Sequence, residues 1–236
     1  MLVDVIPCVN EARSDDLIQK TVIVIDVLRA TSTIVTALEH GCAAVVPTET
    51  VNQAKQCQQE GDLLGGERFC KKIAGFDFGN SPAEYSTPAV AGKRVVLTTT
   101  NGTRAIQKSQ RAGRMLAGCL LNAEACAEAA YSFGRDIVIL CAGTQDEFCL
   151  EDGLCAGLLV RYLQQLGDGR LQANDFGSAM LHAFDAVQGG LEEALLSCAS
   201  GRRLVKLGHE DDVRFCARTN VYRLVPVWKD QSLVRF

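Results

Sequence analysis

The chain has 236 residues, of which 47% are hydrophobic and 22% are charged, and its net charge is −4. This is the composition of an ordinary globular protein with enough residues for a large core, and the acidic balance disfavours a nucleic-acid partner. No apolar run approaches the roughly 18 residues that a membrane span needs, and the first residues lack the basic region of an export signal. Eleven cysteines in such a chain indicate a reducing compartment, so we expect a cytoplasmic protein without a membrane partner.

Short apolar runs alternate with helical patterns along the chain. Buried strands are predicted at 2–7, 21–27, 43–48, 94–100, 114–121, 136–143 and 222–228. Helices are predicted at 32–41, 50–61, 102–113, 122–134 and 151–167. The alternation predicts an α/β fold with a layered, largely parallel or mixed sheet flanked by helices. Residues 61–92 are glycine-rich and irregular, as expected of a loop region at an active site.

An internal repeat relates two parts of the chain. The pattern Asp-x-x-Arg-Ala at 26–30 aligns with Asn-x-x-Arg-Ala at 101–105, and each follows a predicted strand. No linker of low complexity divides the sequence. We therefore expect one compact unit, residues 1–236, with two structurally related halves, about 1–90 and 91–236, that arose by duplication.

The two polar turns of this repeat suit an anion. In parallel sheets, ligands collect at the carboxyl ends of the strands, where helix N-termini offer free backbone N–H groups. An arginine adds a bidentate contact for anionic oxygens. The predicted substrate contacts in these turns are Arg29, Thr31, Ser32, Thr100, Asn101, Gly102, Thr103 and Arg104. The alternative is that the hydroxyls cap helices and the arginines form salt bridges.

Carboxylates near these turns are candidates for catalysis and metal binding. Asp26 ends a strand that reads as buried, where a charge needs a cation, either Arg29 or a metal. Glu67 and Arg68 follow two glycines, and Asp152 stands at the start of a helix. Because Asp and Glu oxygens suit Mg²⁺ rather than zinc, we predict Mg²⁺ ligands at Asp26, Glu67 and Asp152.

The roles of these groups stay open at this point. Asp26 is predicted to be catalytic as a metal ligand, a nucleophile or a general base, and a structural ion pair with Arg29 competes with these roles. Glu67 is predicted to be a metal ligand or a base, with Arg68 as a further anion contact. The alternative for these two residues is a solvated ion pair on a surface hairpin.

The segment GNSPAEY, residues 79–85, reads as the start of a helix. Ser81 is predicted to cap it, Pro82 to occupy the first turn, and Glu84 to complete a capping box. Asn80 has no part in this local structure. We therefore predict that Asn80 faces the substrate.

Four blocks of the sequence resemble one known family. They are VIDVLRATSTIVTAL, GGERFCKKIAGFDFGNSPAEY, VVLTTTNGTRA and CAGTQDEFCLEDGLCAG, in that order. On these blocks the chain is similar to the 2-phosphosulfolactate phosphatases of coenzyme M biosynthesis. The resemblance implies a Mg²⁺-dependent hydrolase that converts (R)-2-phospho-3-sulfolactate to (R)-3-sulfolactate and phosphate.

The substrate implied by this resemblance is a small anion that bears phosphate, sulfonate and carboxylate groups. Such a ligand accounts for several arginines around one pocket. Two alternatives stay open: a phosphatase for a related phospho-hydroxy acid, and a non-catalytic, anion-binding regulatory protein on the same scaffold. A homodimer also stays open.

Overall fold

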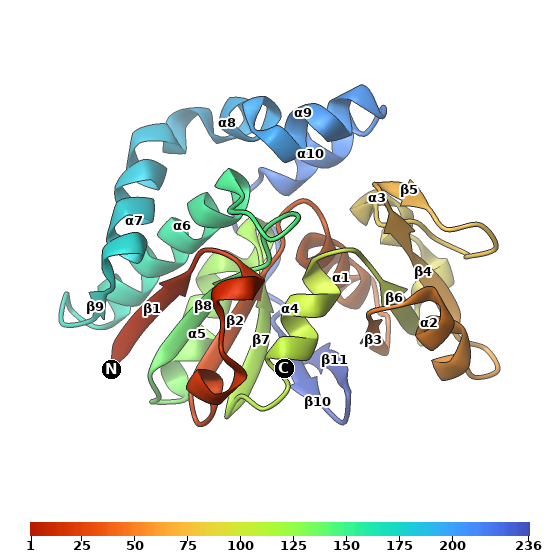
Figure 1. The fold of residues 1–236 in the computed structure, drawn as a ribbon, viewed down its shortest axis with the longest axis horizontal. Helices are drawn as coiled ribbons and strands as arrows, with labels where there is room; N and C mark the ends of the chain where they lie inside the picture. The colour runs from red at the N-terminus through yellow and green to blue at the C-terminus, as the bar shows by residue number, and fades with distance from the viewer.

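One mixed sheet of eleven strands runs through the computed structural model, which describes residues 1–236 (Figure 1). The strands are β1 (Leu2–Ile6), β2 (Thr21–Ile25), β3 (Ala44–Thr48), β4 (Leu63–Arg68), β5 (Lys71–Lys72), β6 (Arg94–Thr98), β7 (Arg114–Gly118), β8 (Ile137–Cys141), β9 (Gln172–Ala173), β10 (Pro226–Lys229) and β11 (Ser232–Arg235). Their order across the sheet is β5-β4-β6-β3-β11-β10-β7-β2-β8-β1-β9.

Helices pack on both sides of this sheet. They are α1 (Ala30–Glu39), α2 (Val51–Cys57), α3 (Pro82–Tyr85), α4 (Gly102–Lys108), α5 (Ala123–Ser132), α6 (Leu150–Leu166), α7 (Asp175–Val187), α8 (Leu191–Ser197), α9 (Ala199–Lys206) and α10 (Glu210–Cys216). Short 3₁₀ helices occur at Val9–Glu11, Ser14–Leu17, Pro88–Val90, Leu120–Asn122 and Gln188–Gly190. None of the helices has both the length and the apolarity to span a membrane.

The sheet contains two groups of parallel strands. One group is β4, β6 and β3, and the other is β7, β2, β8, β1 and β9. The C-terminal hairpin joins them, because β11 pairs antiparallel with β3 and β10 pairs antiparallel with β7. The predicted α/β fold with a mixed sheet flanked by helices is confirmed.

Strand β2 shows how the sequence builds the core. All five of its residues are buried, because β7 and β8 pair with it on either side and helices cover both faces. Side chains alternate between the faces of a strand. Ile23 and Ile25 belong to the core that includes residues of α5 and α6, whereas Val22 and Val24 belong to the core that includes residues of α1 and α4.

The predicted strands and helices are present, but two regions differ from the prediction. Residues 61–92 are not simply a loop region, since β4 lies within them and pairs in parallel with β6. Two glycines weaken the strand signal of β4, and its ladder with β6 compensates for them. No helix was predicted between 168 and 221, where α7 to α10 follow one another and curve over one end of the sheet (Figure 1).

The element order of the predicted repeat is present in the fold. The succession strand, helix, strand, helix occurs as β2-α1-β3-α2 and again as β6-α4-β7-α5. The first polar turn lies between β2 and α1, and the second lies between β6 and α4. A common origin of the two halves stays a prediction.

Candidate active site

One pocket lies at the carboxyl ends of strands from both parallel groups. Its lining comes from the ends of β2, β4, β6 and β8 or the loops after them, from the loop before α3, and from α9. The predicted site residues in the lining are Asp26, Arg29, Glu67, Asn80, Thr100 and Asn101. The fold therefore brings together both polar turns and the segment of β4, as expected for a ligand site in an α/β sheet.

Asp26 occupies the inner end of this pocket and is 8% exposed. Its Oδ1 accepts a hydrogen bond from the backbone N–H of Ala30 at 3.1 Å. Gly102 lies against the other oxygen, where an added Cβ would stand 2.5 Å from Oδ2. Burial raises the pKa of Asp26 to about 7, and the charges of Glu67 and Glu151 act in the same direction. A carboxyl group with this pKa can hold or release a proton near neutral pH.

Glu67 is the second buried carboxylate of the pocket, with 7% exposure. Its Oε1 accepts from the backbone N–H of Thr100 at 2.8 Å and from the Thr100 hydroxyl at 2.9 Å. Its Oε2 accepts from the backbone N–H of Cys70 at 2.7 Å. These contacts hold the carboxylate in one place and join the end of β4 to the turn after β6.

Arg68 does not share this pocket. Its guanidinium donates to the backbone oxygens of Glu67 and Glu49 and to the Thr98 hydroxyl. The alternative of a surface hairpin with a solvated Glu67–Arg68 ion pair is correct in the hairpin, which β4 and β5 form, and wrong in the ion pair. Glu67 is buried and accepts from N–H and O–H donors of the chain. The side chains of successive residues in a strand point to opposite faces, which separates these two.

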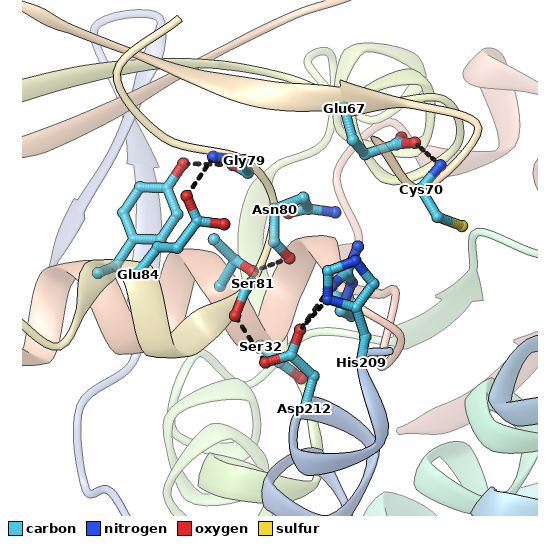
Figure 2. A network of polar contacts seen from close by, with 12 residues as sticks. Ser32, Glu67, Cys70, Gly79, Asn80, Ser81, Glu84, His209 and Asp212 are labelled. Carbon is cyan, nitrogen blue, oxygen red and sulfur yellow. Dashed lines mark hydrogen bonds and ion pairs between the residues drawn. The ribbon is translucent and has the colours of Figure 1, made fainter. Parts of the chain in front are cut away.

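Asn80 presents an unsatisfied acceptor. Its side-chain Oδ1 is buried without a hydrogen-bond partner, while its backbone oxygen accepts from the Thr33 hydroxyl at 3.0 Å. Figure 2 shows the amide on the side of the backbone where Glu67 lies. A buried acceptor without a partner costs about 1–3 kcal/mol, so its place in the pocket lining indicates a polar ligand.

The predicted capping box at the start of α3 is wrong. The Ser81 hydroxyl donates to Asp212 Oδ1 at 2.6 Å, and the Glu84 carboxylate accepts from the backbone N–H of Gly79 at 2.6 Å (Figure 2). A partner from α10 has replaced the local cap. The consequence is that α10 is tied directly to the loop that carries Asn80.

Arg29 is buried in the pocket wall, with 4% exposure, and pairs with a residue of α10. Its Nη1 lies 2.5 Å from Asp212 Oδ2, and His209 Nδ1 lies 3.7 Å from the same oxygen. The predicted alternative, a structural ion pair between Arg29 and Asp26, is therefore wrong, because Arg29 pairs with Asp212 instead. Asp212 holds the Arg29 guanidinium beside the pocket and balances its charge.

Five other predicted contacts lie outside the pocket lining, among them Gly102, which lies against Asp26 Oδ2. The hydroxyls of Thr31, Ser32 and Thr103 are fully buried, and each donates to a backbone carbonyl four or five residues earlier, so they shape the two polar turns. Arg104 is directed elsewhere: its guanidinium pairs with Asp146 at 3.0 Å, and both side chains are more than one-third exposed.

Asp152 lies behind the pocket, not in its lining. Its Oδ1 accepts from the backbone N–H of Val27 at 2.8 Å, and its Oδ2 accepts from that of Gly143 at 3.1 Å. Burial raises the pKa of Asp152 well above its usual range, and the charge of Asp26 adds to this rise. Asp152 thus fastens the carboxyl ends of β2 and β8 to the start of α6.

The donor set fits a lightly ligated Mg²⁺ ion. No cluster of three or more His, Cys, Asp or Glu side chains is arranged to hold a metal. Mg²⁺ typically takes only one or two protein carboxylates and keeps water or phosphate oxygens as its other ligands. Asp26 and Glu67 are two buried carboxylates in one pocket, and the free Oδ1 of Asn80 is a third oxygen there.

Sequence reasoning missed the part of the site that the last helices contribute. Ser200, Arg203 and Leu204 of α9 line the pocket, and Asp212 of α10 supports it from behind. The segment ASGRRLVK carries a usable signal, because its apolar residues fall on one helical face and its basic residues on the other. The pairing of Asp212 with Arg29, which are 183 positions apart, has no local signal.

Comparison with known proteins identifies the family of this chain. The family model described as 2-phosphosulpholactate phosphatase matches residues 8–231. A probable 2-phosphosulfolactate phosphatase of Thermotoga petrophila is 43% identical over 88% of this chain and 88% of its own. Proteins of the same name are 39% identical in Symbiobacterium thermophilum, over 96% of this chain and 98% of theirs, and 37% identical in Clostridium acetobutylicum, over 99% and 100%. The chain therefore belongs to the 2-phosphosulfolactate phosphatase family, which places it among the phosphoric monoester hydrolases.

Proposed function

We propose that this protein is a Mg²⁺-dependent phosphatase that hydrolyses (R)-2-phospho-3-sulfolactate to (R)-3-sulfolactate and phosphate, as in coenzyme M biosynthesis. The observation that carries the proposal is the pair of buried carboxylates, Asp26 and Glu67, in a pocket that also holds Arg29. The names of the relatives support the same substrate.

Asp26 and Glu67 are the residues that would hold the metal. Two buried carboxylates repel each other, and the raised pKa of Asp26 reflects both burial and the Glu67 charge. A divalent cation held by these two residues would offset this repulsion. When bound, Mg²⁺ supplies positive charge for the oxygens of the transferring phosphoryl group.

The other pocket residues then have distinct tasks. Arg29, held by Asp212, binds phosphoryl oxygens with a guanidinium whose orientation is already set. The Asn80 amide orients the same group or a water molecule. Glu67 keeps its position through the N–H groups of Cys70 and Thr100, so the site needs little rearrangement when the substrate enters.

The test is phosphate release from (R)-2-phospho-3-sulfolactate and from an aryl phosphate, measured with Mg²⁺ and after chelation by EDTA. We expect turnover of the sulfolactate ester that EDTA abolishes and added Mg²⁺ restores. Glu67→Gln should reduce kcat/KM by roughly 10²–10³-fold, whereas Glu49→Gln, an exposed acid outside the pocket, should leave it unchanged.

Two other results of this experiment would favour the alternative functions, a phosphatase for a related substrate or a regulatory anion-binding protein. Turnover of other phospho-hydroxy acids without turnover of the sulfolactate ester would assign a related substrate. Binding of the ester without phosphate release, at any Mg²⁺ concentration, would contradict catalysis and favour a regulatory anion-binding protein.

The cysteines support a cytoplasmic location, which we also propose. All eleven are free thiols, and most of them are buried within the cores. Free thiols persist in a reducing compartment. Exposed Cys57 and half-buried Cys70 are the two that would meet an oxidising environment first.

A further inference from the structure

Two guanidinium groups line the pocket, and their surroundings differ. Arg29 is buried and its charge is balanced by Asp212 at 2.5 Å. Arg203, on α9, is exposed and takes part in none of the ion pairs or side-chain hydrogen bonds of the structure. Arg203 therefore keeps its whole charge and all its donors available to a ligand.

Arg203 lies on the exposed side of the pocket, whereas the two carboxylates are buried in it. Asp26 and Glu67 are 8% and 7% exposed, whereas Arg203 is exposed and also lines a groove on the adjoining surface together with Phe69. A ligand in the pocket thus has one end among buried groups and the other beside Arg203.

A second observation places Arg203 beside the turn after β4. Phe69 of that turn and Arg203 both line the pocket, and both also line the outer groove. Cys70 lines the same pocket and donates its N–H to Glu67. Arg203 of α9 and the turn after β4 therefore border the same pocket, although the two segments are far apart in the sequence.

The negative charges of the proposed substrate and of the two carboxylates call for a further cation in the pocket, at the position of Arg203. A phosphoester that carries two further anionic groups brings more negative charge than one divalent ion can balance beside two carboxylates. Arg29 is already paired within the protein, so the anion farthest from the phosphate needs a partner of its own. A planar guanidinium matches the oxygens of a sulfonate in a bidentate contact.

We propose that Arg203 determines specificity: its guanidinium binds the sulfonate at the end of the substrate that does not react. The inference rests on the proposed function and deepens it. It states that the enzyme selects phosphoesters with a distal anion because α9 carries the one cation of the pocket that the protein leaves unpaired.

A neighbouring arginine provides a matched control. Arg202 is on the same helix and is exposed, but it lines only the outer groove and donates to the backbone oxygen of Ser197. Arg202→Ala therefore removes the same charge from α9 without removing a pocket residue. Arg203→Lys keeps the charge and removes the planar fork.

The experiment compares two substrates that differ only in the sulfonate, 2-phospho-3-sulfolactate and 2-phospholactate. We expect Arg203→Ala to lower kcat/KM for the sulfonate ester by about tenfold or more and to change kcat/KM for phospholactate by less than about threefold. Arg203→Lys should fall between the parent and Arg203→Ala, and Arg202→Ala should change neither value. Equal losses on both substrates, or no loss on the sulfonate ester, would overturn the assignment.

A binding measurement separates this inference from the proposed function. Calorimetry with 3-sulfolactate and with lactate, both in Mg²⁺, needs no turnover. If the parent protein binds 3-sulfolactate and Arg203→Ala weakens that binding about tenfold, the assignment stands even when phosphate release fails. If the parent shows no preference for 3-sulfolactate over lactate, the assignment is wrong, whatever the protein hydrolyses.

Discussion

Asp26 shows how burial changes the ionisation of a carboxyl group in the site. The β2 strand carries it into a place with little water, and the charges of Glu67 and Glu151 act on it there. The N–H groups of Ala30 and Gly102 stabilise the charged form, but burial outweighs them, so its pKa rises to about 7. The charge of such a carboxylate destabilises the metal-free fold at neutral pH, and a bound cation would compensate for this cost.

The raised pKa of Asp26 predicts how stability depends on pH. In the unfolded chain Asp26 loses its proton near 3.8, whereas in the folded chain it keeps the proton up to about 7. The folded state therefore binds more protons between these values, and the free energy of unfolding falls as pH rises through this window. For this group alone, the loss between pH 5 and pH 8 is on the order of 2–3 kcal/mol.

Asp26→Asn should remove this dependence. In EDTA, the melting temperature of the variant minus that of the parent should rise by about 4 °C or more from pH 5 to pH 8. Taking the difference between two pH values cancels any pH-independent change in the contacts with Ala30 and Gly102. Asp15→Asn, at an exposed acid, is the control and should show no such rise. A constant difference across the range would mean that Asp26 ionises normally.

At the scale of elements, strand β4 carries Glu67, and the sequence pattern did not predict it as a strand. Gly66 pairs with Thr98 of β6 and has a φ of +146°. A Cβ on Gly66 would stand 2.0 Å from the Thr98 carbonyl oxygen. The glycine therefore allows the two strands to approach so closely that Glu67 can reach the turn after β6.

Gly66→Ala should separate these two strands. We expect a loss of about 3 kcal/mol or more in the free energy of unfolding, because the clash is with backbone and the φ is unfavourable for alanine. Phosphatase activity should fall with it. Gly75→Ala is the matched control, since Gly75 has a φ of +80° but no atom within 4 Å of the added Cβ, and it should lose only about 1–2 kcal/mol. Equal losses in urea unfolding would show that strain alone, and not the β4–β6 contact, sets the cost.

Across the whole molecule, the C-terminal hairpin joins the two groups of parallel strands into one sheet. Strand β11 pairs with β3 of one group, and β10 pairs with β7 of the other. The pocket takes Glu67 from the first group and Asp26 from the second. The hairpin contributes no residue to the pocket, yet it connects the two strand groups that supply the site.

This arrangement predicts one cooperative unfolding transition. Trp228, the single tryptophan, lies on β10 and reports on the hairpin by fluorescence, while far-ultraviolet circular dichroism reports on all helices. The two signals should change at the same urea concentration. Separate midpoints would instead indicate two independent halves.

Leu233→Ala should shift both signals together. Leu233 is fully buried on β11, so its truncation should cost about 2–5 kcal/mol. Val234→Ala, at a half-buried neighbour on the same strand, should cost less than half as much. A Leu233→Ala protein in which fluorescence shifts and circular dichroism does not would contradict the role of the hairpin as the joint of the sheet.

The sequence by itself determined most of the strands and helices up to residue 167 and much of the inner site. Hydrophobic periodicity is local, so β2, β6 and β8 and the helices after them could be read directly. Polar residues that follow buried strands meet at one edge of a parallel sheet, which is why Asp26, Arg29 and Asn101 were predicted together and lie in one pocket.

Only the tertiary structure decided the partners and directions of these side chains. Arg29 pairs with Asp212 from α10, Glu67 is fixed by the turn after β6, and Arg104 turns away to Asp146. The placement of Arg203 on the exposed side of the pocket likewise depends on how the last helices cross the sheet. The physical reason is that a repeat of 2 or 3.6 residues shows which face of an element is buried, whereas ion pairs and strand neighbours depend on crossovers that bring distant segments together.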